Sequence, residues 1–154
     1  MLKIIQAQSE SELTSIRQLF KEYTDSLGFD LSFQNFEQEF AELPGKYAPP
    51  QGRLLLAMGN DKNVGCVGLR KFEENISEMK RLYIKLEFRG NGFGRTLAQK
   101  VIDEARIIGY KYMRLDTVPW MKEAISLYRS MGFIEIPAYR FNPIKGTLYF
   151  ELKL

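Results

Sequence analysis

Arg89-Gly90-Asn91-Gly92-Phe93-Gly94-Arg95 lies between an expected strand and the most regular helical pattern in the chain. At such a junction the helix presents unpaired N–H groups and the positive end of its dipole, which together bind anions. Glycine lets the backbone approach phosphate oxygens and adopt positive φ angles. Arg89 and Arg95 can neutralise a pyrophosphate. The turn therefore predicts a phosphate-binding site, although glycines can also serve only to let a helix pack closely.

Two familiar phosphate-binding motifs do not fit this turn. A P-loop ends in Gly-Lys-Ser/Thr, whereas here Gly94 is followed by Arg95 and Thr96. A Rossmann fingerprint places its third glycine one position later, where this chain has Arg95, and usually follows the first strand of its domain. A plain nucleotide-binding domain of either type is therefore disfavoured.

Helices and strands alternate on the C-terminal side of the turn. The helix after the turn ends before Gly109 and carries one apolar stripe, made of Leu97, Ala98, Val101, Ile102, Ala105 and Ile108. We expect a strand over 112–116, a helix over 119–131, and strands over 133–136 and 146–154. A strand that follows a helix in this way indicates a crossover and a parallel pairing.

Three strands in close succession are expected before the turn, over 53–58, 64–72 and 76–85, and their short connections indicate an antiparallel meander. In the third strand the apolar residues do not keep one parity: Ile76, Met79, Leu82 and Ile84. Either both faces of this strand are buried, or an extra residue forms a bulge.

The N-terminal part begins with an expected strand over 2–7. A helix capped by Ser9 or Ser11 then runs to Leu27, a second helix covers 33–42, and 44–52 is a loop rich in proline and glycine. The whole order predicts a single domain over 1–154 of the α/β class (α+β mixed). Its one mixed, mostly antiparallel sheet would have about seven strands, flanked by about four helices.

Composition narrows the chemistry that this domain can perform. The chain has 154 residues, a net charge of +3 and no histidine. This charge is compatible with an anionic ligand but too small to indicate a nucleic-acid partner. Without histidine, His-based triads and the usual zinc sites are excluded, and no metal site is expected. Catalysis must use carboxylates, tyrosine, lysine, the one cysteine, water or backbone groups.

Cysteine usage and the N-terminal sequence bear on location. Cys66 is the single cysteine, so no intrachain disulfide can form, and the first residues lack the apolar stretch of a secretory signal. No window approaches a membrane span, so no membrane partner is expected. A reducing cytoplasmic location is the expectation.

Several segments together resemble the GNAT N-acetyltransferase superfamily over residues 53–136. They are Glu78-Met79-Lys80-Arg81-Leu82-Tyr83-Ile84, Arg89-x-x-Gly92-x-Gly94, Leu115-Asp116-Thr117, and Ala124-Ile125-x-Leu127-Tyr128-x-x-x-Gly132-Phe133. The resemblance implies a GNAT-like sheet and acetyl-CoA as cofactor. The acceptor would be a primary amine of a small molecule or peptide. Because dimers are frequent among similar proteins, a homodimer is one expected assembly.

The resemblance also implies how the cofactor is bound. The strand through Leu82, Tyr83 and Ile84 would pair its backbone with the pantetheine arm. The N–H groups from Arg89 to Arg95 (Arg89, Gly90, Asn91, Gly92, Phe93, Gly94 and Arg95) would hold the pyrophosphate. The uneven strand looks like the family's bulged strand, whose freed N–H polarises the thioester carbonyl, and Leu82 is the expected donor. Independently of the resemblance, Asp116 and Thr117 end the expected parallel strand, where α/β folds place their ligands. Thr117 would bond the pantetheine or the substrate, whereas Asp116 would only cap a turn.

Tyr128 occupies the position of the family tyrosine that protonates the departing CoA thiolate. A phenol can supply that proton and stay neutral beforehand; ordinary core packing is the alternative. For the general base the expectation is Glu78, acting directly or through water, with Glu73 as the second choice. Both could instead be solvated carboxylates, and a path in which water relays the proton stays open. Cys66 is expected to be a small core residue.

Substrate contacts are expected from segments outside the cofactor motifs. An aromatic cluster with Phe29 and Phe33 and the segment with Tyr139, Arg140 and Asn142 could receive an amine that also carries a carboxylate; for the phenylalanines, helix packing is the alternative. The leading function is an acetyl-CoA-dependent N-acetyltransferase acting by direct attack. The alternatives are a non-catalytic CoA-binding module and an acetyltransferase acting on aminoacyl-tRNA.

Overall fold

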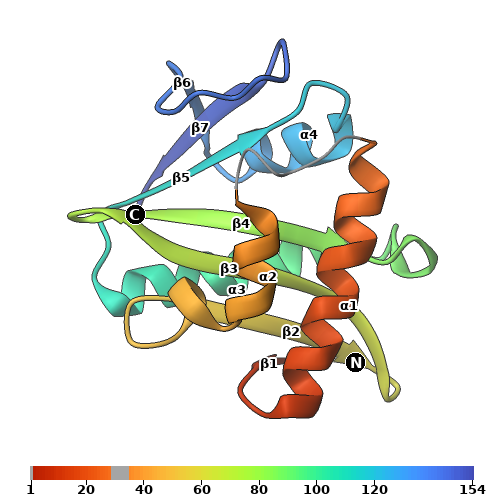
Figure 1. The fold of residues 1–154 in the computed structure, drawn as a ribbon. Helices are drawn as coiled ribbons and strands as arrows, with labels where there is room; N and C mark the ends of the chain where they lie inside the picture. The colour runs from red at the N-terminus through yellow and green to blue at the C-terminus, as the bar shows by residue number, and fades with distance from the viewer. Residues whose placement is uncertain (1, 29–34) are drawn as a thin grey trace.

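One seven-stranded sheet forms the centre of the computed structural model, which describes residues 2–28 and 35–154 (Figure 1). The strand order is β1-β2-β3-β4-β5-β7-β6. The strands are β1 (Lys3–Gln6), β2 (Arg53–Gly59), β3 (Lys62–Glu73), β4 (Ile76–Ile84), β5 (Tyr112–Thr117), β6 (Ile134–Ile136) and β7 (Leu148–Lys153). Among these neighbours β4 and β5 pair in parallel, and the other pairs are antiparallel. The predicted mixed, mostly antiparallel sheet is confirmed.

Four α-helices lie against this sheet, as predicted. They are α1 (Glu10–Leu27), α2 (Phe36–Glu42), α3 (Phe93–Ile108) and α4 (Lys122–Ser130), with short 3₁₀ turns η2 (Gly45–Tyr47) and η3 (Leu86–Phe88). Figure 1 shows α1 and α2 on one face of the sheet and α3 on the opposite face. Ser9 is the N-cap of α1 and forms a capping box with Glu12, which decides between the two predicted caps.

Some predicted element boundaries were wrong. The helix expected over 33–42 begins at Phe36, because Asn35 has a left-handed φ of 56°; residues 33 and 34 lie outside the described part of the chain. The helix expected over 119–131 begins at Lys122, and a turn bond from Met121 N–H to the Val118 carbonyl (3.1 Å) precedes it. The last strand begins at Leu148, after Gly146 with a φ of 83°.

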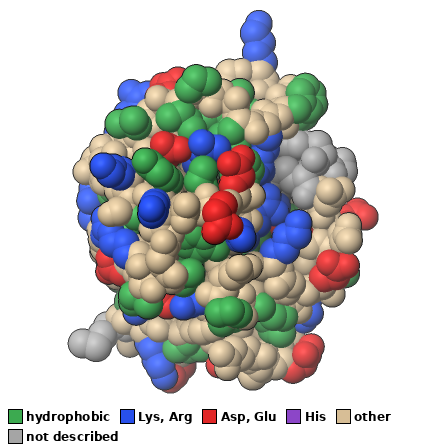
Figure 2. All heavy atoms as spheres, turned by 90° about the vertical axis from the view of Figure 1, so that its left-hand side faces the viewer, with side chains coloured by type: hydrophobic (Ala, Val, Ile, Leu, Met, Phe, Trp, Pro, Cys, Tyr) green, Lys and Arg blue, Asp and Glu red, His purple; other side chains and the backbone are tan. Residues whose placement is uncertain are grey.

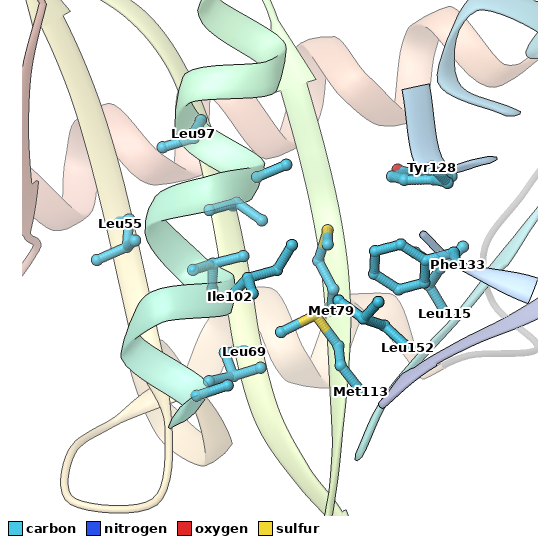
Figure 3. Close-up of a cluster of buried hydrophobic side chains, with 14 of the residues drawn as sticks. Leu55, Leu69, Met79, Leu97, Ile102, Met113, Leu115, Tyr128, Phe133 and Leu152 are labelled. Atoms are coloured by element: carbon cyan, nitrogen blue, oxygen red, sulfur yellow. The ribbon is translucent and has the colours of Figure 1, made fainter. Parts of the chain in front are cut away.

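Two hydrophobic cores fill the two faces of the sheet. The α3 stripe is buried against β2, β3, β4 and β5 in the larger core, and Figure 3 shows Leu97 and Ile102 of this helix beside Leu55 and Leu69. The other core contains α1, with Ile16, Leu19 and Phe20 fully buried. Both faces of the central strands are therefore buried, and this explains why their sequences do not alternate cleanly.

The third strand of the meander, β4, contains a bulge. Cys66 of β3 lies opposite Tyr83 and Gly68 lies opposite Lys80, so two residues of β4, Arg81 and Leu82, face one residue of β3. Arg81 has a φ of 61°, in the left-handed region that non-glycine residues rarely adopt. The residues from Ser77 to Arg81 are all buried as well. Both explanations offered for the uneven pattern therefore hold.

Strands β4 and β5 separate after a short parallel pairing. Their register ends at Glu78 and Arg114, although β4 continues to Ile84 and β5 to Thr117. In Figure 1 the two strands diverge from this point toward α4. The divergence leaves the last residues of β4 without a paired strand on the side of β5. Both spaces described below border this part of β4.

Gly65 offers a test of the close approach between β3 and the end of β4. A Cβ atom at Gly65 would lie 2.3 Å from the Tyr83 carbonyl oxygen, and both residues belong to paired strands. We expect Gly65→Ala to lower the free energy of unfolding by about 1–3 kcal/mol, as overpacking does, measured by urea denaturation. The control is Gly94→Ala, whose added atom would lie 3.8 Å from its nearest neighbour. Equal stabilities of the two variants would contradict this explanation.

Candidate functional site

A groove with a volume of about 710 Å³ runs along the end of β4, the glycine turn and α4. Most of the residues predicted to bind a cofactor line this groove: Leu82, Tyr83, Ile84, Arg89, Gly90, Gly92, Phe93, Gly94 and Arg95. Asn91 does not line it, and its side-chain amide donates a hydrogen bond to the Phe88 carbonyl (3.1 Å). The predicted phosphate turn and the predicted pantetheine strand thus border one groove.

The opposite wall contains residues that the sequence analysis did not single out for binding. They are Ser26 and Leu27 at the end of α1, and Trp120, Met121, Lys122, Glu123, Ala124 and Leu127 in or just before α4. An added Cβ at Gly94 would lie 3.8 Å from Leu127 and 3.9 Å from Ile84, so the start of α3 packs close to both walls and still has room for a methyl group. No glycine or charge pattern marks these wall residues, because the packing of α1 and α4 brings them to the groove.

The glycine turn has the backbone geometry of an anion site. Gly90 and Gly92 have φ angles of 85° and 78°, and a side chain at either position would meet no atom within 4 Å. Gly92 is the N-cap of α3, which has no side-chain cap, and the first helical bond runs from Thr96 N–H to the Gly92 carbonyl (3.1 Å). The N–H groups of the first helical turn therefore have no helical partner and can bind an anion in the groove.

The two arginines of the turn are held by neighbouring groups. Arg89 donates through Nε to the Ile84 carbonyl (2.8 Å), and its guanidinium lies over the Tyr83 ring at 5.6 Å. Arg95 donates a hydrogen bond to the Ser130 hydroxyl of α4. Both positive charges are thereby kept at the rim of the groove, where an anion would need them.

A smaller cavity of about 50 Å³ lies between the diverging strands β4 and β5. It adjoins the groove, because Leu27, Leu82 and Met121 line both spaces. The polar side chains that line it come from several elements: Tyr23, Lys80, Arg81, Asp116, Thr117, Tyr128 and Asn142. Thr117 and Tyr128, both predicted from the sequence to bind cofactor, line this inner cavity rather than the groove.

Tyr128 is a buried residue of α4 with a place in both the core and the inner cavity. Its ring lies 5.7 Å from that of Phe133 and 6.4 Å from that of Phe150, and Figure 3 shows it beside Phe133 at one end of the core. Burial raises the pKa of its phenol, and the nearby Tyr23 and Asp116 raise it further. The phenol thus stays protonated at neutral pH, which is the state that a proton donor needs before the transfer.

Leu82 lies in the bulge, at the junction of the two spaces. Neither Leu82 nor Arg81 has a register partner on β3, because Val67 stands alone opposite them. A bulge takes backbone groups out of the strand ladder and can aim them at a neighbouring site. The location agrees with the predicted role of the Leu82 N–H, which stays a prediction.

Glu78 does not have the surroundings of a general base. Its fully buried carboxylate pairs with Arg70 (2.9 Å) and Arg140 (2.6 Å) and accepts a hydrogen bond from the Tyr139 hydroxyl (2.8 Å). Burial by itself raises the pKa of Glu78, but Lys80, Arg140 and Arg70 outweigh it, so the net pKa is lowered. A base needs a higher pKa and a free lone pair. The geometry therefore argues against the expected base and makes Glu78 a structural anchor.

The predicted substrate segment after β6 is held by this anchor. Tyr139 and Arg140 contact Glu78 directly. The guanidinium groups of Arg114 and Arg140 each lie 5.2–5.6 Å from the ring centres of Phe72 and Tyr139. Asn142, from the same segment, lines the inner cavity. Phe29 and Phe33, the other predicted substrate residues, lie outside the described residues.

Two further candidates are outside the inner cavity and the groove. Cys66 is fully buried, its thiol donates to the Arg81 carbonyl (3.4 Å), and burial raises its pKa, as expected of a core residue. Glu73 is exposed near the end of β3. Across residues 2–28 and 35–154, no cluster of three or more histidine, cysteine, aspartate or glutamate residues could hold a metal ion.

The molecular surface shows no concentration of positive charge on the face drawn in Figure 2, where basic and acidic side chains are interspersed. A basic face is the usual footprint of a nucleic-acid partner. No helix in the described part of the chain is both long and apolar enough to cross a membrane.

Comparisons with known proteins agree with this geometry. Residues 13–133 match the sequence model of the Acetyltransferase (GNAT) family. An uncharacterized N-acetyltransferase of Schizosaccharomyces pombe is 37% identical, over 93% of this chain and 89% of its own length. A GNAT-family acetyltransferase from Staphylococcus aureus has the same fold, with a TM-score of 0.83 at 19% identity over 99% of both chains. The PaiA N-acetyltransferase of Thermoplasma acidophilum, solved in complex with coenzyme A, has a TM-score of 0.77 at 18% identity, covering 100% of this chain and 99% of its own.

The anchor formed by Glu78 has a measurable contribution to stability. We expect Glu78→Gln to lower the free energy of unfolding at pH 7 by about 3 kcal/mol, the lower end of the range for a broken buried ion pair, since Arg70 and Arg140 keep side-chain exposures of 20% and 19%. Urea denaturation measures the change. The exposed Glu74→Gln, which removes a surface pair with Lys71, should change stability by less than about 0.5 kcal/mol.

The same anchor predicts a pH dependence. Because the folded-state pKa of Glu78 lies below its ordinary value of 4.5, the carboxylate stabilises the fold above that pH, and this contribution is lost as the pH falls through the folded-state pKa. The parent protein should therefore lose stability below pH 4.5 more steeply than Glu78→Gln does. Parallel pH profiles would contradict the assignment.

Proposed function

The chain belongs to the acetyltransferase (GNAT) family, and from that premise we propose that it transfers an acetyl group from acetyl-CoA to a primary amine of a small molecule or peptide. Transfer would occur by direct attack in a ternary complex. One observation carries the proposal: the groove beside the glycine turn and the inner cavity between β4 and β5 meet at Leu82. A donor in the groove and an amine in the inner cavity would then have their reacting atoms side by side.

The groove has the features that a CoA molecule requires. Free N–H groups at the start of α3, with Arg89 and Arg95 beside them, suit a pyrophosphate. The end of β4, through Leu82, Tyr83 and Ile84, offers backbone groups to a pantetheine arm along the diverging edge. The CoA complex of a protein with this fold supports the same assignment. Bound acetyl-CoA would supply a thioester, which is an acyl donor activated toward amines.

The residues around the junction would carry the chemistry of transfer. We assign the Leu82 N–H to the carbonyl oxygen, where a donor stabilises the negative charge that develops during attack. The Tyr128 phenol delivers its proton to the departing sulfur, and Thr117, which lines the inner cavity, bonds the pantetheine or the substrate. Attack requires a neutral amine, because an ammonium group has no lone pair. Because Glu78 is held in ion pairs, the ammonium group of the acceptor loses its proton to water before attack. A second proton leaves the nitrogen as the amide forms, and it returns to the Tyr128 oxygen, which has given its own proton to the sulfur.

Ligand binding can be tested without knowledge of the acceptor. Acetyl-CoA at a hundredfold excess over its Kd should raise the Tm by roughly 5–10 °C, because a ligand selective for the folded state adds about 2.7 kcal/mol. Gly92→Val should abolish this shift, since Gly92 lines the groove and its φ of 78° strongly disfavours a β-branched residue, so the turn must change conformation.

The matched control is Gly109→Val, at the other end of α3, where the φ of 108° is equally unfavourable and nothing lies within 4 Å. It should lose stability but keep the acetyl-CoA shift. An unchanged Tm of the parent protein at millimolar acetyl-CoA would refute the cofactor assignment.

Tyr128→Phe tests the assigned proton donor. We expect kcat to fall by about 10²–10⁴-fold, the range for loss of a positioned acid, while the acetyl-CoA shift in Tm persists. Turnover is measured as release of free CoA against a panel of amines, from polyamines and amino acids to peptides. Tyr110→Phe, which removes a hydroxyl bonded to the Gln51 carbonyl away from both cavities, should leave kcat unchanged. A Tyr128→Phe enzyme with full turnover would rule out this role.

A further inference from the structure

Asp116 is an unusual carboxylate in the wall of the inner cavity. It lies on β5, two residues beyond the last position paired with β4, and lines the cavity together with Leu82, Thr117 and Tyr128. Its Oδ2 atom is buried and has no hydrogen-bond partner among the residues that the structure describes. A buried carboxylate oxygen that lacks a donor costs free energy, because its hydration is lost and nothing replaces it.

Three acidic side chains of the sheet and of α2 form ion pairs. Glu78 binds Arg70 and Arg140, Glu151 binds Arg114 (2.8 Å), and Glu39 binds Arg81 (3.0 Å). Asp116 forms no ion pair with a residue of the described ranges 2–28 and 35–154, although Lys80 lines the same cavity. The three paired carboxylates are thus neutralised by arginines of the fold. The Asp116 carboxylate keeps an oxygen at the cavity that a ligand can bind.

The charge of Asp116 acts at the centre of the site. It contributes to the pKa of Tyr23 from α1, Lys80 from β4, Tyr128 from α4, Tyr149 from β7, and Tyr139 and Arg140 from the segment between β6 and β7. Burial lowers the pKa of Lys80 to about 7, so this lysine is only partly charged at neutral pH and offsets Asp116 incompletely. A cation bound at Asp116 would therefore lie close to the proposed proton donor.

We propose that Asp116 is the docking group for the acceptor, and that its Oδ2 atom accepts a hydrogen bond from the primary ammonium group of the substrate. The inference rests on the proposed function and specifies the class of substrate: amines that arrive as cations. An ammonium group has three donors and no acceptor, which is the complement of an unpaired carboxylate oxygen.

The size of the cavity limits how much of the acceptor enters. A volume of about 50 Å³ is only a few times the roughly 10–15 Å³ that one water needs in a cavity. The amino group and the carbons next to it fit, and the remainder of a larger acceptor must extend out of the cavity. Held at Asp116, the nitrogen lies in the same cavity as Leu82 and Tyr128, the residues assigned to the carbonyl oxygen and the leaving sulfur.

Asp116→Asn tests this inference, because it keeps the shape and removes the charge. We expect the KM for the amine to rise at least tenfold, with a smaller change in kcat and an unchanged acetyl-CoA shift in Tm. The Tm of the unliganded variant should be equal or higher, because an uncompensated buried charge is removed. A purely structural aspartate would show the reverse, a lower Tm with an unchanged KM. Asp103→Asn, at an exposed position of α3, is the matched control and should change none of these values.

A binding measurement separates this inference from the proposed function. In the parent protein, n-butylammonium should raise the Tm and 1-butanol should not, and Asp116→Asn should lose the difference between the two probes. Equal responses of parent and variant, or an unchanged amine KM, would overturn the docking role. If acetyl-CoA does not raise the Tm of the parent protein, the proposed function is overturned instead. The comparison between n-butylammonium and 1-butanol remains valid in that case. If Asp116→Asn does not fold, Asp116→Ser is measured in the same way.

Discussion

The divergence of β4 from β5 beyond Glu78 and Arg114 is the constraint on which the other features of this protein depend. If the two parallel strands stayed paired along their whole length, no space would remain between them. The separation instead leaves the end of β4 without a paired strand on that side, and the bulge at Arg81 and Leu82 interrupts the pairing with β3. The groove and the inner cavity both border this part of β4, so the two spaces of the proposed site follow from one break in the sheet.

A cluster of buried charges holds the point where the strands separate. Glu78 binds Arg70, Arg140 and Tyr139, and Arg114 next to it binds Glu151. Each charged side chain of this cluster has a partner, which offsets the cost of removing it from water. Because two of these partners belong to the segment between β6 and β7, the cluster also fixes that segment near the inner cavity, where Asn142 contributes to the lining. The carboxylate that looked like a base in the sequence is therefore a support for the site.

The start of α3 completes the groove through backbone conformation. Gly90 and Gly92 adopt positive φ angles that leave the N–H groups of the helix accessible, and α4 packs close enough to form the facing wall. Asp116 shows a different balance between stability and binding. Its buried oxygen lacks a partner within the fold, a local cost that a site tolerates when a ligand supplies the missing donor.

Much of this protein could be predicted from its sequence, because the decisive signals are local. The apolar stripe of α3, the glycine turn and the parallel strand were predicted from spacing and turn residues. A bulge in β4 was one of two explanations of its uneven pattern, and the resemblance to the family added Leu82 as the residue in it. Element boundaries were predicted less well, since α2 and β7 begin only after Asn35 and Gly146, whose positive φ angles the sequence does not reveal. The pairing of Glu78, the unpaired oxygen of Asp116 and the wall formed by α4 depend on residues far apart in the chain. Only tertiary packing brings those groups together. The role of a buried carboxylate then depends on which charges and hydrogen-bond donors lie beside it, because they determine its protonation and its free lone pairs.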